Sequence, residues 1–391
     1  MTTRIRPIPG TDFESLFVLH GGRVRRALER AGLVQDSRLR SGRVAVILAV
    51  VTWLPLLILA IVEGVAWGER VEVPLLEDFL PYGQFLVALP VLVWGESIVA
   101  QILERTVAEL RRSDLLAPEE NRELDALLTR FVLRWKGRSM NALLMLLTFA
   151  ATGLSFWGVR EWLSGGWQYV DERLTLPGWW YLLIGMTVLR FLELRWLWRF
   201  LLWAWFLSRV ARLKLQPRPT HPDRAGGLAY LGATQAGFGV LVFALGVQLS
   251  CLVADGFSYQ GADLLAFSTY LIAFVLITMV VLLLPLLVFA PKLVQAREEG
   301  LVYLSGSGYE GANELESKLR GRWTEDVSAD EISGLADFGA LYENARWTKP
   351  LPLEIRHVFA MVLSAVLPFL PLVFLVVPAQ DVVRTLTSLL L

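Results

Sequence analysis

The sequence predicts an all-α protein: a polytopic membrane bundle of about seven transmembrane helices with a cytoplasmic layer of amphipathic helices. Three observations support this fold class. Hydrophobic residues make up 55% of the 391 residues and charged residues 19%, with a mean hydropathy of +0.51, which is more apolar than a soluble core requires. Seven apolar runs are long enough to cross a bilayer. Lys and Arg are concentrated between alternate runs. Lipid is therefore the expected solvent for most of the chain.

The seven runs differ in how strongly they predict a span. Five contain no charged residue, namely 44–62, 140–159, 225–254, 264–291 and 358–380. The run 85–103 contains Glu96, and the run 178–207 contains Arg190, Glu193, Arg195 and Arg199. Thirty residues at about 1.5 Å per residue still cross a hydrocarbon layer of about 30 Å. We therefore treat both charged runs as spans.

The distribution of positive charge predicts the orientation. Of the 37 Lys and Arg residues, thirty lie in segments 1–43, 104–139, 208–224 and 292–357, and four lie in the alternate segments. Cytoplasmic loops are enriched in these residues, so we expect a cytoplasmic N-terminus and an outer C-terminus. No cleavable signal is apparent before the first span. The expected organisation is an N-terminal amphipathic region (1–43), six spans (44–291) with a helical loop (104–139), a cytoplasmic helical insertion (292–357), and a last span with an outer tail (358–391).

Three cytoplasmic segments have the pattern of amphipathic helices. Thr11 with Glu14 and Ser328 with Glu331 have capping-box spacing, and Pro118 suits a first helical position. The three helices either form one layer or lie separately on the membrane surface. Gly306, Gly308 and Gly311 predict a flexible loop before the last of them. They do not form a phosphate-binding loop, because no GK[ST] ending follows them.

The charged residues inside the spans need partners, because each costs about 2.5–3.5 kcal/mol in a bilayer on insertion scales. Measured along the helices, Glu96 lies about 16 Å and Arg190 about 18 Å from the expected outer ends. This matching depth predicts a Glu96–Arg190 pair with Glu193 and Arg195 nearby, lining a pore or substrate path. The alternative is that Arg195 and Arg199 extend to the headgroups while Glu193 pairs with Arg190 within one helical turn.

The fifth run is unusually rich in small residues. Ala229, Ala233 and Gly237 recur at a spacing of four, which allows another helix to approach closely. Uncharged polar residues, chiefly Thr234, Gln235 and Gln248, lie in the same run. They either line a conduction or transport path, or belong to a helix whose small residues serve only tight packing.

The segment Pro219–Gly227, PTHPDRAGG, precedes this run and is the most distinctive stretch of the chain. Its prolines end the previous helix and its glycines permit a turn. His221 and Asp223 can bind a cation or respond to pH, while Arg224 with the N–H groups of Gly226 and Gly227 can hold a phosphate. Alternatively, Asp223 caps the next helix. We interpret the segment as a cytoplasmic gate or ligand contact.

This segment, together with WLPLL at residues 53–57, resembles an uncharacterised family of bacterial polytopic membrane proteins that carry a PTHPDRAGGL-like stretch. The resemblance covers a small part of the chain. It implies a bacterial inner membrane and no particular activity.

The predicted function is a channel or transporter for a small ion, with its path in the fourth and fifth spans. The alternative is a non-transporting scaffold or sensor that binds lipid headgroups or a protein at its basic cytoplasmic face. A wet intramembrane charge network favours transport, and a dry, fully paired one favours the scaffold. A third class, a lipid-modifying enzyme using His221 and Asp223, has no supporting motif. We therefore predict no enzyme activity.

The composition also bears on cofactors and partners. We predict no cofactor and no metal, because the three His are widely spaced and Cys251 is the single Cys. The 37 acidic residues balance the basic ones, which argues against nucleic-acid binding. The expected partners are the lipid bilayer, a small ion and a second copy of the chain.

Overall fold

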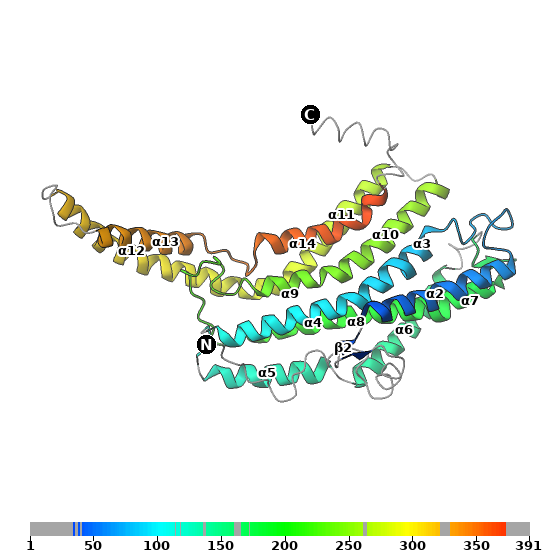
Figure 1. Ribbon diagram of the computed structural model, residues 1–391, viewed down its shortest axis with the longest axis horizontal. Helices are drawn as coiled ribbons and strands as arrows, with labels where there is room; N and C mark the ends of the chain where they lie inside the picture. Colours follow the sequence, from blue (N-terminus) through cyan, green and yellow to red (C-terminus); the bar gives the residue numbers. More distant parts are fainter. Residues whose placement is uncertain are drawn as a thin grey trace.

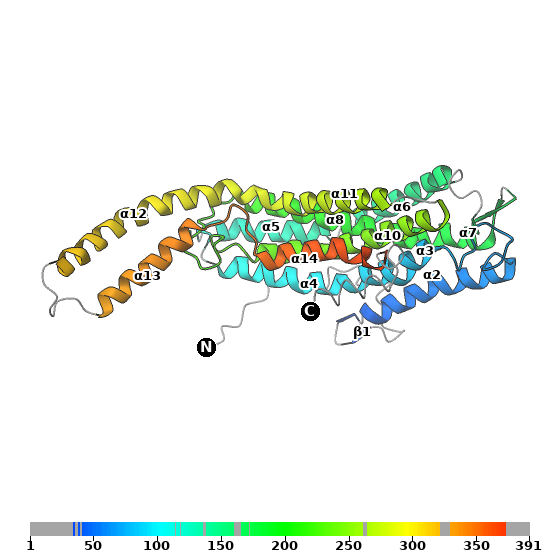
Figure 2. The same ribbon diagram turned by 90° about the horizontal axis from the view of Figure 1, so that it is seen from above.

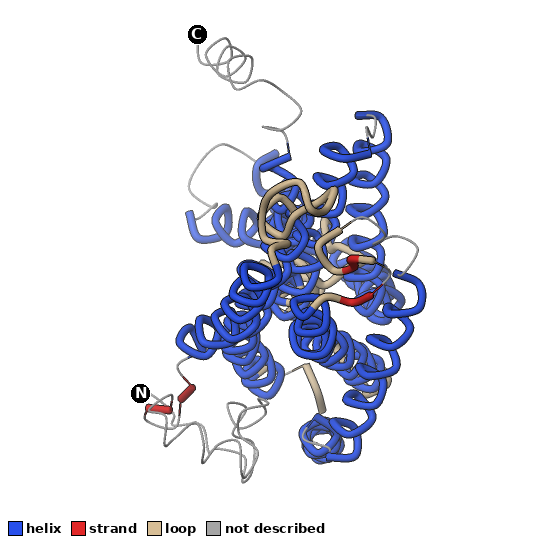
Figure 3. Tube along the Cα trace, turned by 90° about the vertical axis from the view of Figure 1, so that its right-hand side faces the viewer, coloured by secondary structure: helices blue, strands red, loops and turns tan. Residues whose placement is uncertain are grey.

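The computed structural model describes residues 34–35, 38–39, 41–113, 115–117, 119–135, 138–159, 166–171, 173–260, 264–320 and 329–372. Helices run side by side along the long axis of the molecule, and two of them extend beyond the bundle at one end (Figures 1 and 2). Viewed along that axis, the helices form a bundle with short loops between them (Figure 3). Two small antiparallel hairpins join β1 (Val34–Gln35) to β2 (Arg38–Leu39), and β3 (Tyr169–Val170) to β4 (Arg173–Leu174).

The first half of the bundle contains two long helices, each interrupted by a π-helical segment. One consists of α3 (Phe79–Tyr82), η3 (Gly83–Ala88) and α4 (Leu89–Arg112). The other consists of α7 (Leu176–Trp180), η4 (Tyr181–Met186) and α8 (Thr187–Val210). The π segments meet: the Phe85 ring lies where a side chain at Gly185 would be, and the Tyr181 hydroxyl donates to Gln84 Oε1 at 2.7 Å. Glycine at 185 therefore permits close packing of the two helices.

Three further helices pack around this pair. They are α2 (Ser41–Glu63) against α4, and α5 (Glu120–Trp135) and α6 (Arg138–Val159) against α8. The second half contains α9 (Leu231–Gly237), α10 (Gly239–Gln260), α11 (Leu264–Leu283), α14 (Ile355–Val366) and the 3₁₀ turn η6 (Leu367–Phe369). Most buried apolar side chains of both halves form one core that includes Trp196, Trp203 and Phe238, and a second, smaller cluster joins the end of α10 to η6.

The expected flexible glycine loop after the sixth span is wrong, because the chain stays helical there. After α11, the 3₁₀ segment η5 (Leu284–Phe289) leads into α12 (Ala290–Arg320), which contains Gly306, Gly308 and Gly311. The helix α13 (Ala329–Arg346) packs against α12, and the two form the projecting hairpin of Figure 2. A Cβ at Gly308 would lie 2.7 Å from the Phe338 ring. At Gly308, therefore, glycine serves helix packing and not chain flexibility.

Five helices are long and apolar enough to cross a membrane: Ser41–Glu63, Phe79–Arg112, Leu231–Tyr259, Ser268–Gly311 and Ile355–Leu372. They correspond to five of the seven predicted spans. The other two runs form α6, with an apolar part at Met140–Leu154, and the charge-bearing helix α7–η4–α8. Large apolar side chains cover outward faces, as at Leu276, Ile277 and Val280 of α11. Such a surface suits lipid and not water.

Two of the three amphipathic helices predicted from caps are present. They are α5, which begins at Glu120, and α13, which begins at Ala329. The predicted N-terminal helix lies outside the described residues. The fifth apolar run differs from expectation at its start, because residues 225–230 form turns and the helix begins at Leu231.

Candidate functional site

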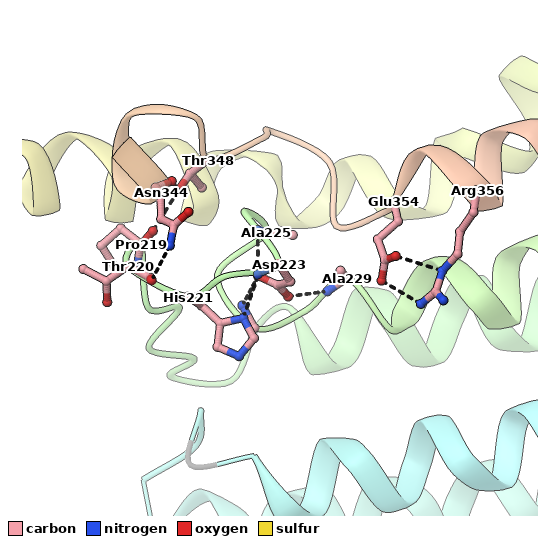
Figure 4. A network of polar contacts seen from close by, with 11 residues as sticks. Pro219, Thr220, His221, Asp223, Ala225, Ala229, Asn344, Thr348, Glu354 and Arg356 are labelled. Carbon is pink, nitrogen blue, oxygen red and sulfur yellow. Dashed lines mark hydrogen bonds and ion pairs between the residues drawn. The ribbon is translucent and has the colours of Figure 1, made fainter. Parts of the chain in front are cut away.

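The Asp223 carboxylate organises the loop between α8 and α9. Its Oδ1 accepts hydrogen bonds from the N–H groups of Ala225 (2.8 Å) and Gly227 (3.1 Å), and its Oδ2 accepts one from Ala229 (3.1 Å). His221 Nδ1 lies 2.8 Å from Oδ1 (Figure 4). Partial burial opposes the charge, but these hydrogen bonds outweigh it and hold the pKa of Asp223 below its ordinary value. Asp223 therefore binds N–H groups within the loop. It is not the N-cap of the next helix, because the residue preceding α9 is Tyr230.

Residues 216–230, hereafter the 216–230 loop, adopt a strained backbone to surround this carboxylate. Arg224, Gly226 and Gly227 all have positive φ, at 53°, 65° and 85°. Glycine takes such values without steric cost, while Arg224 takes them only because its surroundings fix it. The N–H of Gly227 is already bonded to Asp223. It is not available for the phosphate contact that the sequence suggested.

The 216–230 loop is also anchored to the projecting hairpin. Asn344 Nδ2 donates to the carbonyl of Thr220 (3.4 Å), Thr348 Oγ1 donates to that of Pro219 (3.2 Å), and the N–H of Lys349 donates to that of Arg224 (2.8 Å). Figure 4 shows the first two contacts above the loop, with the His221 ring on the side facing α4. The loop thus connects the bundle to α13.

A cavity of about 550 Å³ lies between the 216–230 loop and the last three turns of α4. Three arginines belong to its lining: Arg105 and Arg112 from α4, and Arg218 from the loop. None of them is ion-paired with a residue that the structure describes. Ser113 and Tyr230 add hydroxyl groups, and Ile102 and Ala233 add apolar surface.

The acidic residues of the cavity are mostly engaged elsewhere. Asp223 is surrounded by backbone donors, and Glu354 is paired with Arg356 at 2.8 Å while it caps α14 (Figure 4). Glu109 is the one carboxylate of the lining for which the described residues offer no partner. The cavity therefore has three available guanidinium groups against one available carboxylate. This arrangement suits an anion.

The Tyr230 hydroxyl is a further donor without a defined acceptor. It is buried near Ser113 but makes no hydrogen bond of good geometry with the residues that the structure describes. Burial raises the pKa of Tyr230, so the hydroxyl keeps its proton. A buried donor without an acceptor is costly, and such atoms in folded proteins need an explanation. A bound anion would supply the missing acceptor.

Sequence reasoning found only part of this cavity. Of the predicted residues, His221, Asp223 and Gly227 belong to its lining, whereas Gly226 packs against Pro217 and Leu293. Arg224 is outside the lining. The three arginines and Tyr230 were missed. The available signal was the seven-residue spacing of Arg105 and Arg112, which places both on one face of a helix.

The predicted intramembrane network exists, but with different partners. Glu96 Oε1 lies 2.9 Å from Arg199 Nη1 and 4.0 Å from Arg195 Nε, so the expected Glu96–Arg190 pair is wrong. Arg190 instead pairs with Glu193, one turn away, at 3.0 Å. The alternative that Arg195 and Arg199 extend to the headgroups is also wrong, because these side chains are 5% and 3% exposed.

The uncharged polar residues of the fifth run are bonded within the bundle. Thr234 Oγ1 lies 2.6 Å from Thr106 Oγ1, and Gln235 accepts from Trp203 Nε1 at 3.1 Å and donates to the carbonyl of Leu282. Gln248 donates to Glu193 Oε1. Thr234 and Gln235 are completely buried. Their predicted role in lining a path remains a prediction.

The cluster of Glu96, Arg195 and Arg199 is buried and has a net positive charge. Arg195 Nη1 is buried and has no hydrogen-bond partner among the residues described. A groove of about 190 Å³ reaches Glu96, but the rest of its lining is almost wholly apolar, with residues such as Val93, Phe191 and Leu192. The apolar surroundings are those expected of a scaffold, but the cluster is not fully paired, so it meets neither of the two expected patterns completely.

Among the described residues, no group of three His, Cys, Asp or Glu side chains is placed to hold a metal ion. Comparison with known proteins finds no match: no family model, no curated protein and no solved structure matches the chain. The argument about function therefore depends on the site alone.

Proposed function

We propose that this chain is a multi-pass membrane protein that binds the phosphate of an anionic lipid headgroup in the cavity beside the 216–230 loop, acting as a scaffold or sensor. The observation that carries the proposal is the set of three guanidinium groups, from Arg105, Arg112 and Arg218, around one cavity and without ion pairs to described residues. Guanidinium groups bind phosphate through paired, charge-assisted hydrogen bonds.

The depth of the cavity favours a lipid over a soluble phosphate. The apolar run of α4 ends at Leu103, and the cavity is lined from Ile102 to Ser113. Its arginines therefore begin where the hydrocarbon-facing part of the helix ends, which is the level of the headgroups. The apolar part of the lining, with Ile102 and Ala233, can contact the first carbons of an acyl chain.

The proposal includes the orientation predicted from charge. With seven spans and a cytoplasmic N-terminus, the 216–230 loop and the α12–α13 hairpin face the cytoplasm. Because the loop is bonded to the end of α13 through Thr220 and Pro219, a headgroup held by Arg218 can bias the position of the hairpin. That coupling would make the protein a sensor and the hairpin its output.

The test is equilibrium binding of short-chain phosphatidic acid to the purified protein in detergent, with phosphatidylcholine and inorganic phosphate as comparison ligands. Arg112→Gln and Arg218→Gln should each weaken phosphatidic acid binding about tenfold or more, since a hydrogen bond to a charged group contributes about 1.5–3 kcal/mol. Arg212→Gln is the matched control, because Arg212 is exposed just before the loop and outside the cavity lining.

The comparison ligands separate the sources of phosphate. Tighter binding of phosphatidic acid than of inorganic phosphate, with little binding of phosphatidylcholine, supports a lipid headgroup. Equal binding of phosphatidic acid and inorganic phosphate indicates a soluble ligand instead. Equal affinities of the two cavity variants, Arg212→Gln and the wild type contradict the proposal.

A second candidate function, transport of a small ion, is favoured by one observation. The cluster of Glu96, Arg195 and Arg199 holds one more positive than negative charge within the bundle, and Arg195 Nη1 lacks a partner. A permeating anion would neutralise this excess. Anion efflux from liposomes that is lost in Arg195→Gln, at equal protein incorporation, would support transport. Equal efflux from protein-containing and protein-free liposomes contradicts it.

A further inference from the structure

The long helix α3–η3–α4 contributes to the cavity at its C-terminal end, and Asp78 lies just before its N-terminal end. Asp78 joins three segments of the chain. It is 8% exposed and precedes α3, where its Oδ1 accepts from the N–H of Leu80 at 3.0 Å. Its Oδ2 accepts from Trp167 Nε1 at 2.8 Å and from Gln168 Nε2 at 3.3 Å. Asp78 thus holds the segment before β3 against the start of α3.

A second carboxyl group reaches the same helix start from α10. Asp255 Oδ1 accepts from the N–H of Phe79 at 3.0 Å, next to the N–H that Asp78 uses. The two carboxyl groups therefore accept from adjacent N–H groups at one helix start, which brings them side by side. A hydrogen bond between two carboxyl groups requires a proton on one of them, because ionised carboxylates only accept.

We propose that Asp78 and Asp255 together bind one proton, and that this shared proton holds the end of α10 against the start of α3. With the proton present, one carboxyl can donate to the other, and Asp255 keeps its bond to the N–H of Phe79 at 3.0 Å. With both groups ionised, two negative charges lie side by side and repel each other. The pair is thus a proton-dependent latch, independent of the headgroup cavity.

The surroundings of the pair favour proton retention. The ionisable groups facing it are Glu77 and Tyr82 from its own segment, Tyr181 from η4, and Cys251 and Tyr259 from α10. None of these groups is a cation. Among the described residues neither carboxyl has an ion pair. Burial raises the pKa of Asp78 despite four hydrogen bonds to its carboxyl.

Gln168 supplies an independent observation. Its side chain is 4% exposed and its Oε1 has no hydrogen-bond partner among the described residues, although its amide nitrogen contacts Asp78. Rotation of this amide by 180° would bring Oε1 to Asp78 Oδ2, where a protonated carboxyl donates to it. The unpaired carbonyl therefore lies where a proton on Asp78 can be shared.

Two neighbouring contacts depend on the latch. Tyr259 donates its hydroxyl to the carbonyl of Glu77 at 2.9 Å, one turn beyond Asp255. Cys251, one turn before Asp255, has its sulfur 2.4 Å from where a Cβ on Gly83 would be. Separation of α10 from α3 would expose this sulfur. The single cysteine of the chain is therefore a native reporter of the latch.

The experiment measures the rate of Cys251 alkylation by a neutral maleimide in the full-length protein in detergent, from pH 5.5 to 8.5. The reference is Asp255→Asn, whose amide donates to Asp78 without a titratable proton and still accepts from Phe79. Dividing the wild-type rate by the Asp255→Asn rate at each pH removes the ordinary titration of the thiol. The ratio should rise with pH, by up to about tenfold per unit once both carboxyls ionise.

A second variant keeps the test decisive. Asp255→Ala removes the latch altogether, so its alkylation should be fast at all pH values relative to Asp255→Asn. If Asp255→Ala does not fold, the ratio of wild type to Asp255→Asn alone decides. A ratio that stays constant across the pH range overturns the proposal. Binding of phosphatidic acid should be unchanged in Asp255→Asn, which separates this test from that of the headgroup cavity.

Discussion

Asp223 and the Asp78–Asp255 pair lie at opposite ends of the long helix α3–η3–α4 and differ in how a carboxyl group is accommodated. Asp223 alone receives three backbone N–H groups and contacts His221. Asp78 and Asp255 together receive two backbone N–H groups, an indole and an amide. Accordingly the pKa of Asp223 is lowered, whereas burial raises that of Asp78.

The difference shows that a buried carboxylate stays charged when it has enough donors for itself. A second carboxyl at the same donors shifts the balance toward proton binding. Both ends have a helix start or turn with backbone donors, so the presence of donors alone does not decide whether a carboxyl group stays ionised. One end consequently suits a permanent structural charge beside an anion cavity, and the other suits a titrating contact.

Glu96 is the extreme case, because its ion pairs are with arginines and it receives no backbone N–H group from the described residues. Glu96→Gln leaves Arg195 and Arg199 buried without their counter-ion, so we expect a loss of about 3–5 kcal/mol in the free energy of unfolding. The measurement is SDS-induced unfolding in mixed micelles, followed by tryptophan fluorescence.

A double-mutant cycle identifies the partner of Glu96. Glu96→Gln with Arg199→Gln should recover much of the loss, whereas Glu96→Gln with Arg190→Gln should give the sum of the two single losses. Coupling to Arg190 and additivity with Arg199 would refute the pairing found here.

Asp223→Ala should have the next largest effect. It leaves three backbone N–H groups of the 216–230 loop without their acceptor, at an expected loss of about 2–4 kcal/mol. The same unfolding assay measures it, and Asp125→Ala is a control with an exposed ion pair to Arg111. A loss no larger than that of the control would mean that water replaces the carboxylate.

The two ends should respond to pH with opposite signs. Asp223 has a lowered pKa, so its contribution to stability is present above the ordinary Asp pKa of about 3.9 and is lost as pH falls below it. Asp78 has a raised pKa, so its contribution is complete below about pH 3.9 and is lost as pH rises through the higher folded value. Asp223→Ala should therefore remove acid sensitivity, and Asp255→Asn should remove sensitivity at higher pH. Unfolding measured from pH 3 to 8 checks both slopes; unchanged slopes in the two variants contradict the comparison.

The smallest effect is expected for His221→Gln. The His221 side chain is 44% exposed and contacts Asp223, which already has its backbone donors. Exposed ion pairs contribute about 0–1 kcal/mol, so stability should change little at any pH. A loss comparable to that of Asp223→Ala would show that the imidazole, and not the backbone, holds the carboxylate.

The sequence predicted the helices of this fold better than their contacts. Apolar runs located the five long apolar helices, and start signals located two amphipathic helices, α5 and α13. Both succeeded because length and periodicity are local properties. Depth along a helix correctly suggested that Glu96 needs a partner on the 178–207 run. It could not choose between Arg190 and Arg199, which are nine residues apart and so lie on opposite faces at 3.6 residues per turn.

The cavity could not be predicted from local sequence patterns, because its residues come from distant parts of the chain. Arg112 and Arg218 are more than a hundred positions apart in the sequence, and only the packing of the 216–230 loop onto α4 brings them together. The glycine-rich stretch of α12 was misread because Gly308 owes its identity to Phe338 of another helix. Composition shows where a chain can bend, while packing decides whether it does.

The central claim is that a phosphate headgroup occupies the cavity between α4 and the 216–230 loop. Photo-crosslinking tests it most directly, using phosphatidic acid with a photoreactive group next to the phosphate, followed by peptide mapping in lipid nanodiscs. We predict crosslinks concentrated in residues 102–113 and 216–230 and lost in Arg112→Gln with Arg218→Gln. Crosslinks spread along the lipid-facing surfaces of α2, α11 and α14, with no change in that variant, would contradict the claim.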